Sequence, residues 1–125
     1  MASLLGKMLP PSVSDSIAQL QRFPLEIRDA YRSFRSTGDI AALHMVVLAV
    51  VRDYMPQPAE TPLTDEMRLI EDLGYDSLAV AETVFFLEDL LQVRIENKEL
   101  LQVRTVGELR GFVTRKVEQK PPAAA

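Results

Sequence analysis

Ser77 is the residue of this chain whose type and surroundings most favour chemistry. It follows Gly74 and Asp76 and opens a largely apolar run that predicts a helix. A helix start presents such a hydroxyl outward, and the unpaired N–H groups and dipole there favour a phosphate. Gly74 allows the sharp turn that leads into the helix. The setting therefore indicates either a plain N-cap serine or a serine whose hydroxyl is modified.

The composition excludes several other kinds of chemistry. The chain has no cysteine, so disulfides, thiolate nucleophiles and cysteine zinc sites are excluded, and no metal site is expected. The G-x-S-x-G elbow of serine hydrolases is absent around Ser77. The single histidine, His44, falls in a different predicted helix and is expected to be a packed core or interface residue.

The run E-D-L-G-Y-D-S-L at residues 71–78, followed by T-V-G at residues 105–107, resembles the signature of the acyl carrier protein family. The resemblance covers about residues 39–117. It implies that Ser77 carries a 4′-phosphopantetheine arm, transferred from coenzyme A by a phosphopantetheinyl transferase. It also implies that Asp76 and Leu78 belong to the attachment site, and that Asp76 assists the metal-dependent step of the transfer.

The elements that position Ser77 are all predicted to be helices. Apolar spacing and capping residues predict helices over residues 24–37, 40–55, 77–92 and 97–101 and another from residue 106. A further helix is predicted after Ser14, and residues 55–76 are predicted to form a long loop pinned to the core. The fold class is all-α, which the resemblance refines to a four-helix acyl-carrier bundle (three main helices plus one short) with extra N-terminal helices.

The chain divides into three predicted segments: an N-terminal helical extension at residues 1–38, the acyl carrier domain at 39–119 and a disordered tail at 120–125. Residues 40–51 are apolar on nearly every side of their helix, so the side that faces away from the bundle needs a cover. The extension is expected to supply that cover within the same chain. Self-association through residues 13–51 is the alternative.

The helix after Ser77 has a face that partner proteins could contact. An apolar side chain flanked by carboxylates fits a basic rim on an enzyme, although Phe85 could instead pack inward. The candidate docking residues are Leu78, Glu82, Phe85, Glu88 and Asp89. The opposite, core side is expected to consist of Ala81, Val84, Leu87 and Leu91.

The resemblance further implies a shelter for the acyl chain between this helix and the short one. The matching positions are Val84, Leu87, Ile95, Leu100, Val103 and Leu109. Phe86, Leu100 and Leu109 are larger than the residues frequent in the family at these places, which implies a smaller cavity.

The charge of the chain bears on its partners. Residues 39–119 carry fifteen acidic and eight basic side chains, which disfavours nucleic acid and favours basic protein surfaces. The apolar stretch at residues 40–51 is too short to cross a membrane, and a cytoplasmic location is expected.

The functional hypothesis is a carrier without catalysis of its own. It would hold acyl thioesters for acyl-activating, condensing and reducing enzymes of fatty-acid or polyketide type. The alternatives are an aminoacyl or peptidyl carrier for nonribosomal synthesis, and an unmodified helical interaction module.

Overall fold

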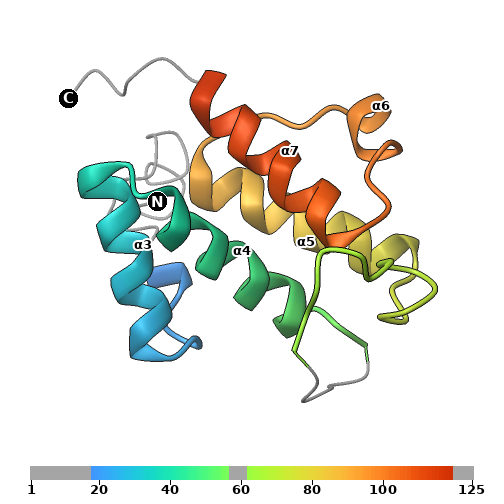
Figure 1. The fold of residues 1–125 in the computed structure, drawn as a ribbon, viewed down its shortest axis with the longest axis horizontal. Coiled ribbons are helices and arrows are strands. Elements are labelled where there is room, and N and C mark those ends of the chain that lie inside the picture. The colour runs from blue at the N-terminus through green and yellow to red at the C-terminus, as the bar shows by residue number, and fades with distance from the viewer. Residues whose placement is uncertain (1–17, 57–61, 120–125) are drawn as a thin grey trace, which may run out of the picture.

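The computed structural model describes residues 18–56 and 62–119. The expectations for a helix beginning after Ser14 and for the tail at 120–125 lie outside these residues. The described helices are α3 (Leu25–Thr37), α4 (Ile40–Asp53), α5 (Ser77–Leu91), α6 (Asn97–Leu100) and α7 (Val106–Gln119), arranged as Figure 1 shows. The one β pairing in the described part is an isolated bridge between Arg68 and Thr105. The prediction of an all-α carrier bundle is confirmed.

Helices α3 and α4 form a hairpin because the two residues between them are a helix stop and a helix start. Gly38 adopts a left-handed conformation at φ +78°, and its N–H donates to Phe34 O. Asp39 then caps α4, because its carboxylate accepts from the N–H groups of Ala41 and Ala42. So short a connection places the two helices side by side.

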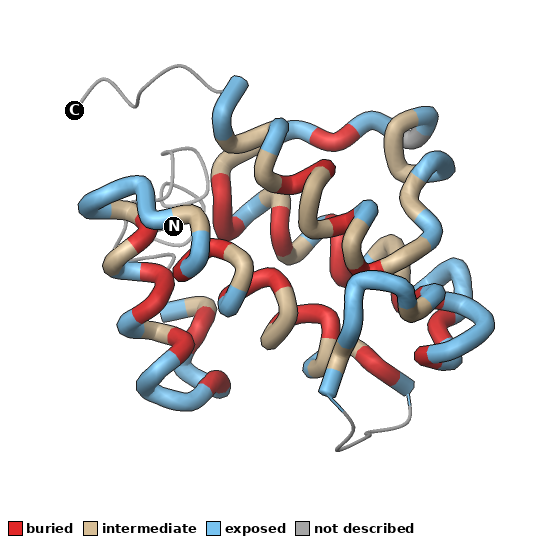
Figure 2. Tube along the Cα trace, in the orientation of Figure 1, coloured by how far each residue is buried: buried red, intermediate tan, exposed pale blue. Residues whose placement is uncertain are grey.

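Helix α4 is the centre of the bundle, since it packs against α3, α5 and α7. This position explains why it is apolar on nearly every side. One core cluster runs from Leu20 of the extension to Val113 of α7, and the buried stretches in Figure 2 lie along the facing sides of these helices. The expected cover within the chain is therefore confirmed for the described residues. Residues 13–51 were the candidate surface for self-association. Of these, the described residues from 18 onward bury most of their apolar side chains in this core.

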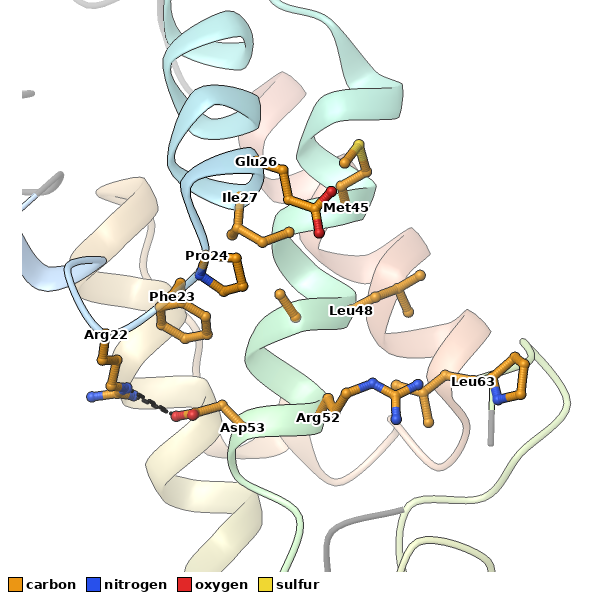
Figure 3. Close-up of a pocket in the computed structure, with 12 residues that line it drawn as sticks. Arg22, Phe23, Pro24, Glu26, Ile27, Met45, Leu48, Arg52, Asp53 and Leu63 are labelled. Carbon is orange, nitrogen blue, oxygen red and sulfur yellow. Dashed lines mark hydrogen bonds and ion pairs between the residues drawn. The ribbon is translucent and has the colours of Figure 1, made fainter. Parts of the chain in front are cut away.

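Arg22 connects the extension to the end of α4 and to the middle of α5. Its guanidinium lies 5.0–5.4 Å from the ring centroids of Phe23, Tyr54 and Phe86 and forms an ion pair with Asp53 at 2.8 Å. Figure 3 shows the ion pair between Arg22 and Asp53, two residues that line a cavity of about 590 Å³ between the start of α3 and α4. The ring of Phe86 is thus packed against Arg22 and Phe23 of the extension.

Two details of the sequence predictions are corrected. Helix α4 ends at Asp53 and not at residue 55, because Pro56 disfavours the helical conformation in Met55, whose N–H donates instead to Arg52 O. The buried side of α5 consists of Ala79, Thr83, Val84, Leu87, Leu90 and Leu91, whereas Ala81 is only half-buried. An apolar helix flanked by neighbours on two sides has no single polar stripe, so its pattern does not define one core face.

Across residues 18–56 and 62–119, no helix combines the length and the hydropathy that crossing a membrane would require.

Candidate functional site

Asp76 and not Ser77 is the N-cap of α5. The Asp76 backbone is extended, and its Oδ1 accepts a 2.7 Å hydrogen bond from the N–H of Ala79. Ser77 is the first residue of the helix and is exposed. Its hydroxyl has no hydrogen-bond partner among the described residues. The cap interpretation of Ser77 is therefore wrong, and the hydroxyl is free for modification.

Tyr75 fixes the turn before this serine. Its side chain is buried, and its hydroxyl donates a 2.6 Å hydrogen bond to Val51 O at the end of α4. The hydroxyl of Thr83 in α5 lies 3.2 Å from the Tyr75 hydroxyl. Burial raises the pKa of Tyr75 to about 12. Gly74, at φ +74°, makes the bend that turns Tyr75 inward while Ser77 faces outward.

The loop that leads to Ser77 is held against the start of α7. Leu69 N donates to Arg104 O at 2.9 Å, and Val106 N donates to Met67 O at 2.9 Å. Gly107 N donates to Asp65 O at 3.0 Å. A Cβ on Gly107 would lie 2.8 Å from the Cβ of Asp65, so only glycine allows this approach. The glycine of the T-V-G motif is thus required for the close contact between the Ser77 loop and the start of α7.

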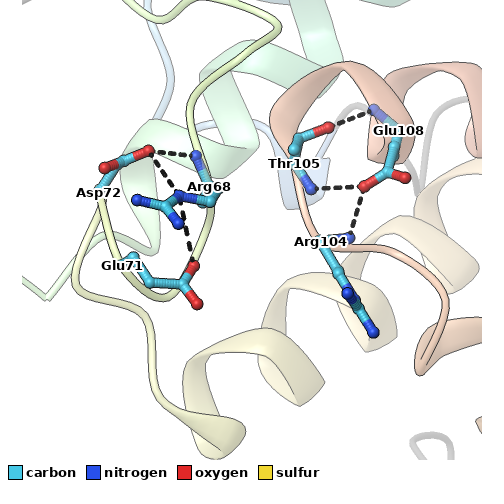
Figure 4. Close-up of polar contacts among 6 residues, drawn as sticks. All are labelled: Arg68, Glu71, Asp72, Arg104, Thr105 and Glu108. Atoms are coloured by element: carbon cyan, nitrogen blue, oxygen red, sulfur yellow. Dashed lines mark hydrogen bonds and ion pairs between the residues drawn. The ribbon is translucent and has the colours of Figure 1, made fainter.

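A capping box starts α7, as predicted. Glu108 N donates to Thr105 Oγ1 at 3.1 Å, and Glu108 Oε1 accepts from Thr105 N at 3.0 Å. Figure 4 shows that the same carboxylate also accepts from the backbone N–H of Arg104. The backbone hydrogen bonds from Arg104 and Thr105 lower the pKa of Glu108.

On the loop side of Figure 4, Arg68 lies between two carboxylates. Its Nε is 3.5 Å from Asp72 and 3.8 Å from Glu71. The backbone N–H of Arg68 also donates to Asp72, and this hydrogen bond is the largest cause of the lowered pKa of that carboxyl group. The positive charge of Arg68 is therefore already paired.

A cavity of about 470 Å³ opens beside Ser77. Its lining is mostly apolar: Leu69, Ile70, Val80, Leu100, Leu101 and Val103, with Arg68, Glu71, Ser77 and Arg104 as its polar members. An exposed hydroxyl next to an apolar hollow fits a covalently attached arm that carries an apolar group. The residues present therefore suit a phosphopantetheine ester.

The structure brings together some of the predicted pocket residues. Leu100 and Val103 line the cavity, and both pack against a small cluster that contains Val84 and Ile95. The two remaining positions, Leu87 and Leu109, are fully buried in the main core and do not line the cavity. Phe112, which sequence reasoning did not assign to the pocket, completes the small cluster.

The predicted docking face is largely exposed. Leu78 is 67% and Phe85 63% exposed, and both Glu82 and Asp89 are exposed beside them. The inward-packed alternative for Phe85 is therefore wrong. Glu88 has another contact, because its Oε2 accepts a 2.6 Å hydrogen bond from Ile95 N and so holds the loop after α5.

His44 packs between α4 and α7, as expected. Its Nε2 lies 3.0 Å from Thr114 Oγ1. Burial, with the charge of Arg110 as the second cause, lowers the pKa of His44. This histidine is a contact between two helices.

A helical bundle with a free serine hydroxyl at a helix start, beside an apolar cavity, is the architecture of a carrier for a tethered group. The family model for the phosphopantetheine attachment site matches residues 46–113, and the chain belongs to the acyl carrier protein family defined by this site. Its cofactor is covalently bound 4′-phosphopantetheine.

Several acyl carrier proteins are similar to this chain. Acyl carrier protein MbtL of Mycobacterium sp. (strain MCS) is 41% identical over 85 residues, which cover 68% of this chain and 94% of that protein. The meromycolate extension acyl carrier protein of Mycolicibacterium aurum is 35% identical over 69 residues, covering 55% and 69%. The acyl carrier protein of Syntrophobacter fumaroxidans is 29% identical over 77 residues, covering 62% and 94%. No solved structure matches the chain.

Proposed function

We propose that the protein carries acyl intermediates as thioesters on a 4′-phosphopantetheine arm attached to Ser77. The observation that carries this proposal is the free, exposed Ser77 hydroxyl at the start of α5, which borders an apolar cavity of about 470 Å³. The arm supplies the thiol that forms the thioester. The chain itself orients the arm and has no catalytic function of its own.

The residues of the site then have separate tasks. Asp76 holds the first turn of α5 through its bond to Ala79 N, so that Ser77 stays at a fixed outward position. The cavity side chains Leu100 and Val103, with Val80, offer an apolar surface to the acyl group. Tyr75 fixes the turn from the inside.

The docking proposal concerns the exposed face of α5. Leu78 and Phe85 form apolar contacts, and Glu82 and Asp89 attract a basic enzyme rim. The partners proposed are a phosphopantetheinyl transferase and acyl-activating, condensing and reducing enzymes of fatty-acid or polyketide type. The cytoplasmic location expected from the sequence stays a prediction.

The experiment is intact-mass measurement after incubation with coenzyme A, magnesium and a promiscuous phosphopantetheinyl transferase. We expect one phosphopantetheine increment on the wild-type protein and none on Ser77→Ala. Asp76→Asn should keep the cap, because asparagine caps as well as aspartate, and yet be loaded more slowly if the charge assists the transfer. Asp76→Ala should lose both properties.

The opposite outcome has a clear meaning. A folded wild-type protein that several transferases leave unmodified would contradict the carrier function and favour the unmodified interaction module. Loading followed by exclusive acceptance of aminoacyl groups would favour the nonribosomal alternative.

A further inference from the structure

Arg104 stands at the rim of the Ser77 cavity with its backbone fixed and its charge unpaired. Its backbone N–H donates to Glu108 Oε1 at 3.0 Å, and its carbonyl accepts from Leu69 N at 2.9 Å. Figure 4 shows its side chain extending away from the Glu108 carboxylate. Among residues 18–56 and 62–119 its guanidinium has no ion-pair partner.

The other cation that lines this cavity already forms ion pairs. Arg68 is paired with Glu71 and Asp72 at 3.8 and 3.5 Å. The first turn of α5 carries no basic side chain that could neutralise an anion at Ser77. Arg104 therefore lines this cavity as a cation that forms no ion pair among the described residues, although its charge acts at longer range on the Glu108 carboxylate.

A phosphodiester on the Ser77 hydroxyl adds a negative charge where other negative charges already lie nearby. The Asp76 carboxylate is the neighbouring side chain, and Glu71 and Asp72 share the single positive charge of Arg68, which leaves an excess of negative charge. Like charges this close raise the energy of the modified state unless a cation compensates. A guanidinium suits this task, because its planar N–H groups bind two phosphate oxygens at once.

We propose that Arg104 binds the phosphodiester of the prosthetic arm and holds the first part of the arm against the cavity. This inference rests on the proposed attachment at Ser77. The contact is exposed, so it is weak and sensitive to salt. The arm is thus held between encounters and remains free to leave for an enzyme.

The test uses the full chain loaded by a promiscuous transferase, with complete loading established by intact mass. We expect a narrower ³¹P line for the phosphodiester in Arg104→Gln than in wild type, because the phosphate moves more freely. In the wild-type protein, the Nε–H signal of Arg104 should shift on loading, and this shift should shrink in about 0.5 M NaCl. Arg94→Gln is the matched control, since Arg94 is also exposed but lies beyond the other end of α5.

Two results would overturn the inference while the carrier function stands. One is normal loading with the same ³¹P line in Arg104→Gln and wild type, as expected if Arg104 meets an acidic partner protein instead. The other is equal narrowing in Arg94→Gln, which would indicate a general charge effect. Absence of any mass increment on the wild-type protein would contradict the proposed function itself, and the inference with it.

Discussion

The outward position of Ser77 depends on a tyrosine hydroxyl that no motif describes. Val51 is in the last turn of α4, where carbonyl groups lack helical partners, and the Tyr75 hydroxyl satisfies one of them at 2.6 Å. Tyr31 does the same for Leu90 O at the end of α5, at 3.0 Å. Each hydroxyl joins a side chain from one segment to the end of a helix from another. The turn before Ser77 is thereby part of the core.

Tyr75→Phe should lower the free energy of unfolding by about 1–3 kcal/mol at neutral pH, because it leaves the Val51 carbonyl buried without a partner. The wild-type protein should also lose stability between about pH 10 and 12. The pKa of Tyr75 is about 12 in the folded protein and 10.0 ordinarily, so this hydroxyl loses its proton at a lower pH in the unfolded chain than in the folded protein. The stabilisation that comes from the raised pKa of Tyr75 is fully present below about pH 10 and is lost as the pH approaches 12.

Urea unfolding from pH 8 to 11.5 measures both effects. Removing the ionisable hydroxyl in Tyr75→Phe should flatten the alkaline loss relative to wild type. An identical pH dependence in the two proteins would show that Tyr75 does not titrate as its buried position requires.

The sequence was enough to propose Ser77 as the attachment serine, but it could not predict the immediate surroundings of Ser77. Asp76 and Ser77 are both good N-cap residues, and a pattern cannot decide which of two adjacent candidates occupies the cap. Arg104 reaches the site through the chain's tertiary path, 27 positions after Ser77, and nothing in its local sequence indicates that role. Glu88 likewise has a contact, to Ile95 N, that depends on the loop after α5.

At the scale of elements, the helices were predictable because strong stop and start residues separate them. Gly38 and Asp39 define the boundary between α3 and α4, and the Thr105–Glu108 box defines the start of α7. The burial of α5 was harder to predict. Its residues belong both to the main core and, through Val84, to the small cluster, and two large apolar side chains, Leu78 and Phe85, are exposed on another face. Apolar residues therefore lie on several sides of α5, and helical periodicity does not choose one face.

Gly107→Ala tests the contact between α7 and the Ser77 loop. A methyl group there would meet the Asp65 side chain at 2.8 Å and the Asp65 carbonyl oxygen at 3.1 Å. We expect the free energy of unfolding to fall by about 1–3 kcal/mol, and phosphopantetheine loading to slow because the loop shifts. Gly111→Ala is the control, since its nearest neighbour is the flexible end of Arg115 at 3.6 Å.

The control should behave in the opposite way. Alanine inside a helix is favoured over glycine, and an added Cβ at the half-buried Gly111 would make only an ordinary contact, so Gly111→Ala should gain about 0.5–1 kcal/mol in urea unfolding. Equal stability of Gly107→Ala and wild type would mean that the loop does not depend on its close approach to α7.

At the scale of the whole molecule, the N-terminal extension and the carrier helices share one core. The predicted boundary at residue 38 separates two sequence segments, yet the core cluster crosses it through Tyr31, Phe34, Val47 and Leu90. Sequence indicated that α4 needed a cover, but could not specify the contacts at its ends. The stacking of Arg22 on Phe86 and the bond from Tyr31 to Leu90 O bring together residues about 60 positions apart.

This shared core predicts that the extension and the carrier unfold together. Tyr31 of α3 is fully buried, and its hydroxyl bonds to Leu90 O of α5. Tyr31→Ala should therefore lower the free energy of unfolding by about 3–5 kcal/mol, and α3 and α5 should be destabilised equally. In native-state hydrogen exchange at increasing urea, the most protected amides of α3 and α5 should lose the same opening free energy. Leu25→Ala, which removes a side chain that is 58% exposed in the same helix, should leave both nearly unchanged. Loss confined to the amides of α3 would mean that the extension is a separate unit resting on an independently stable carrier.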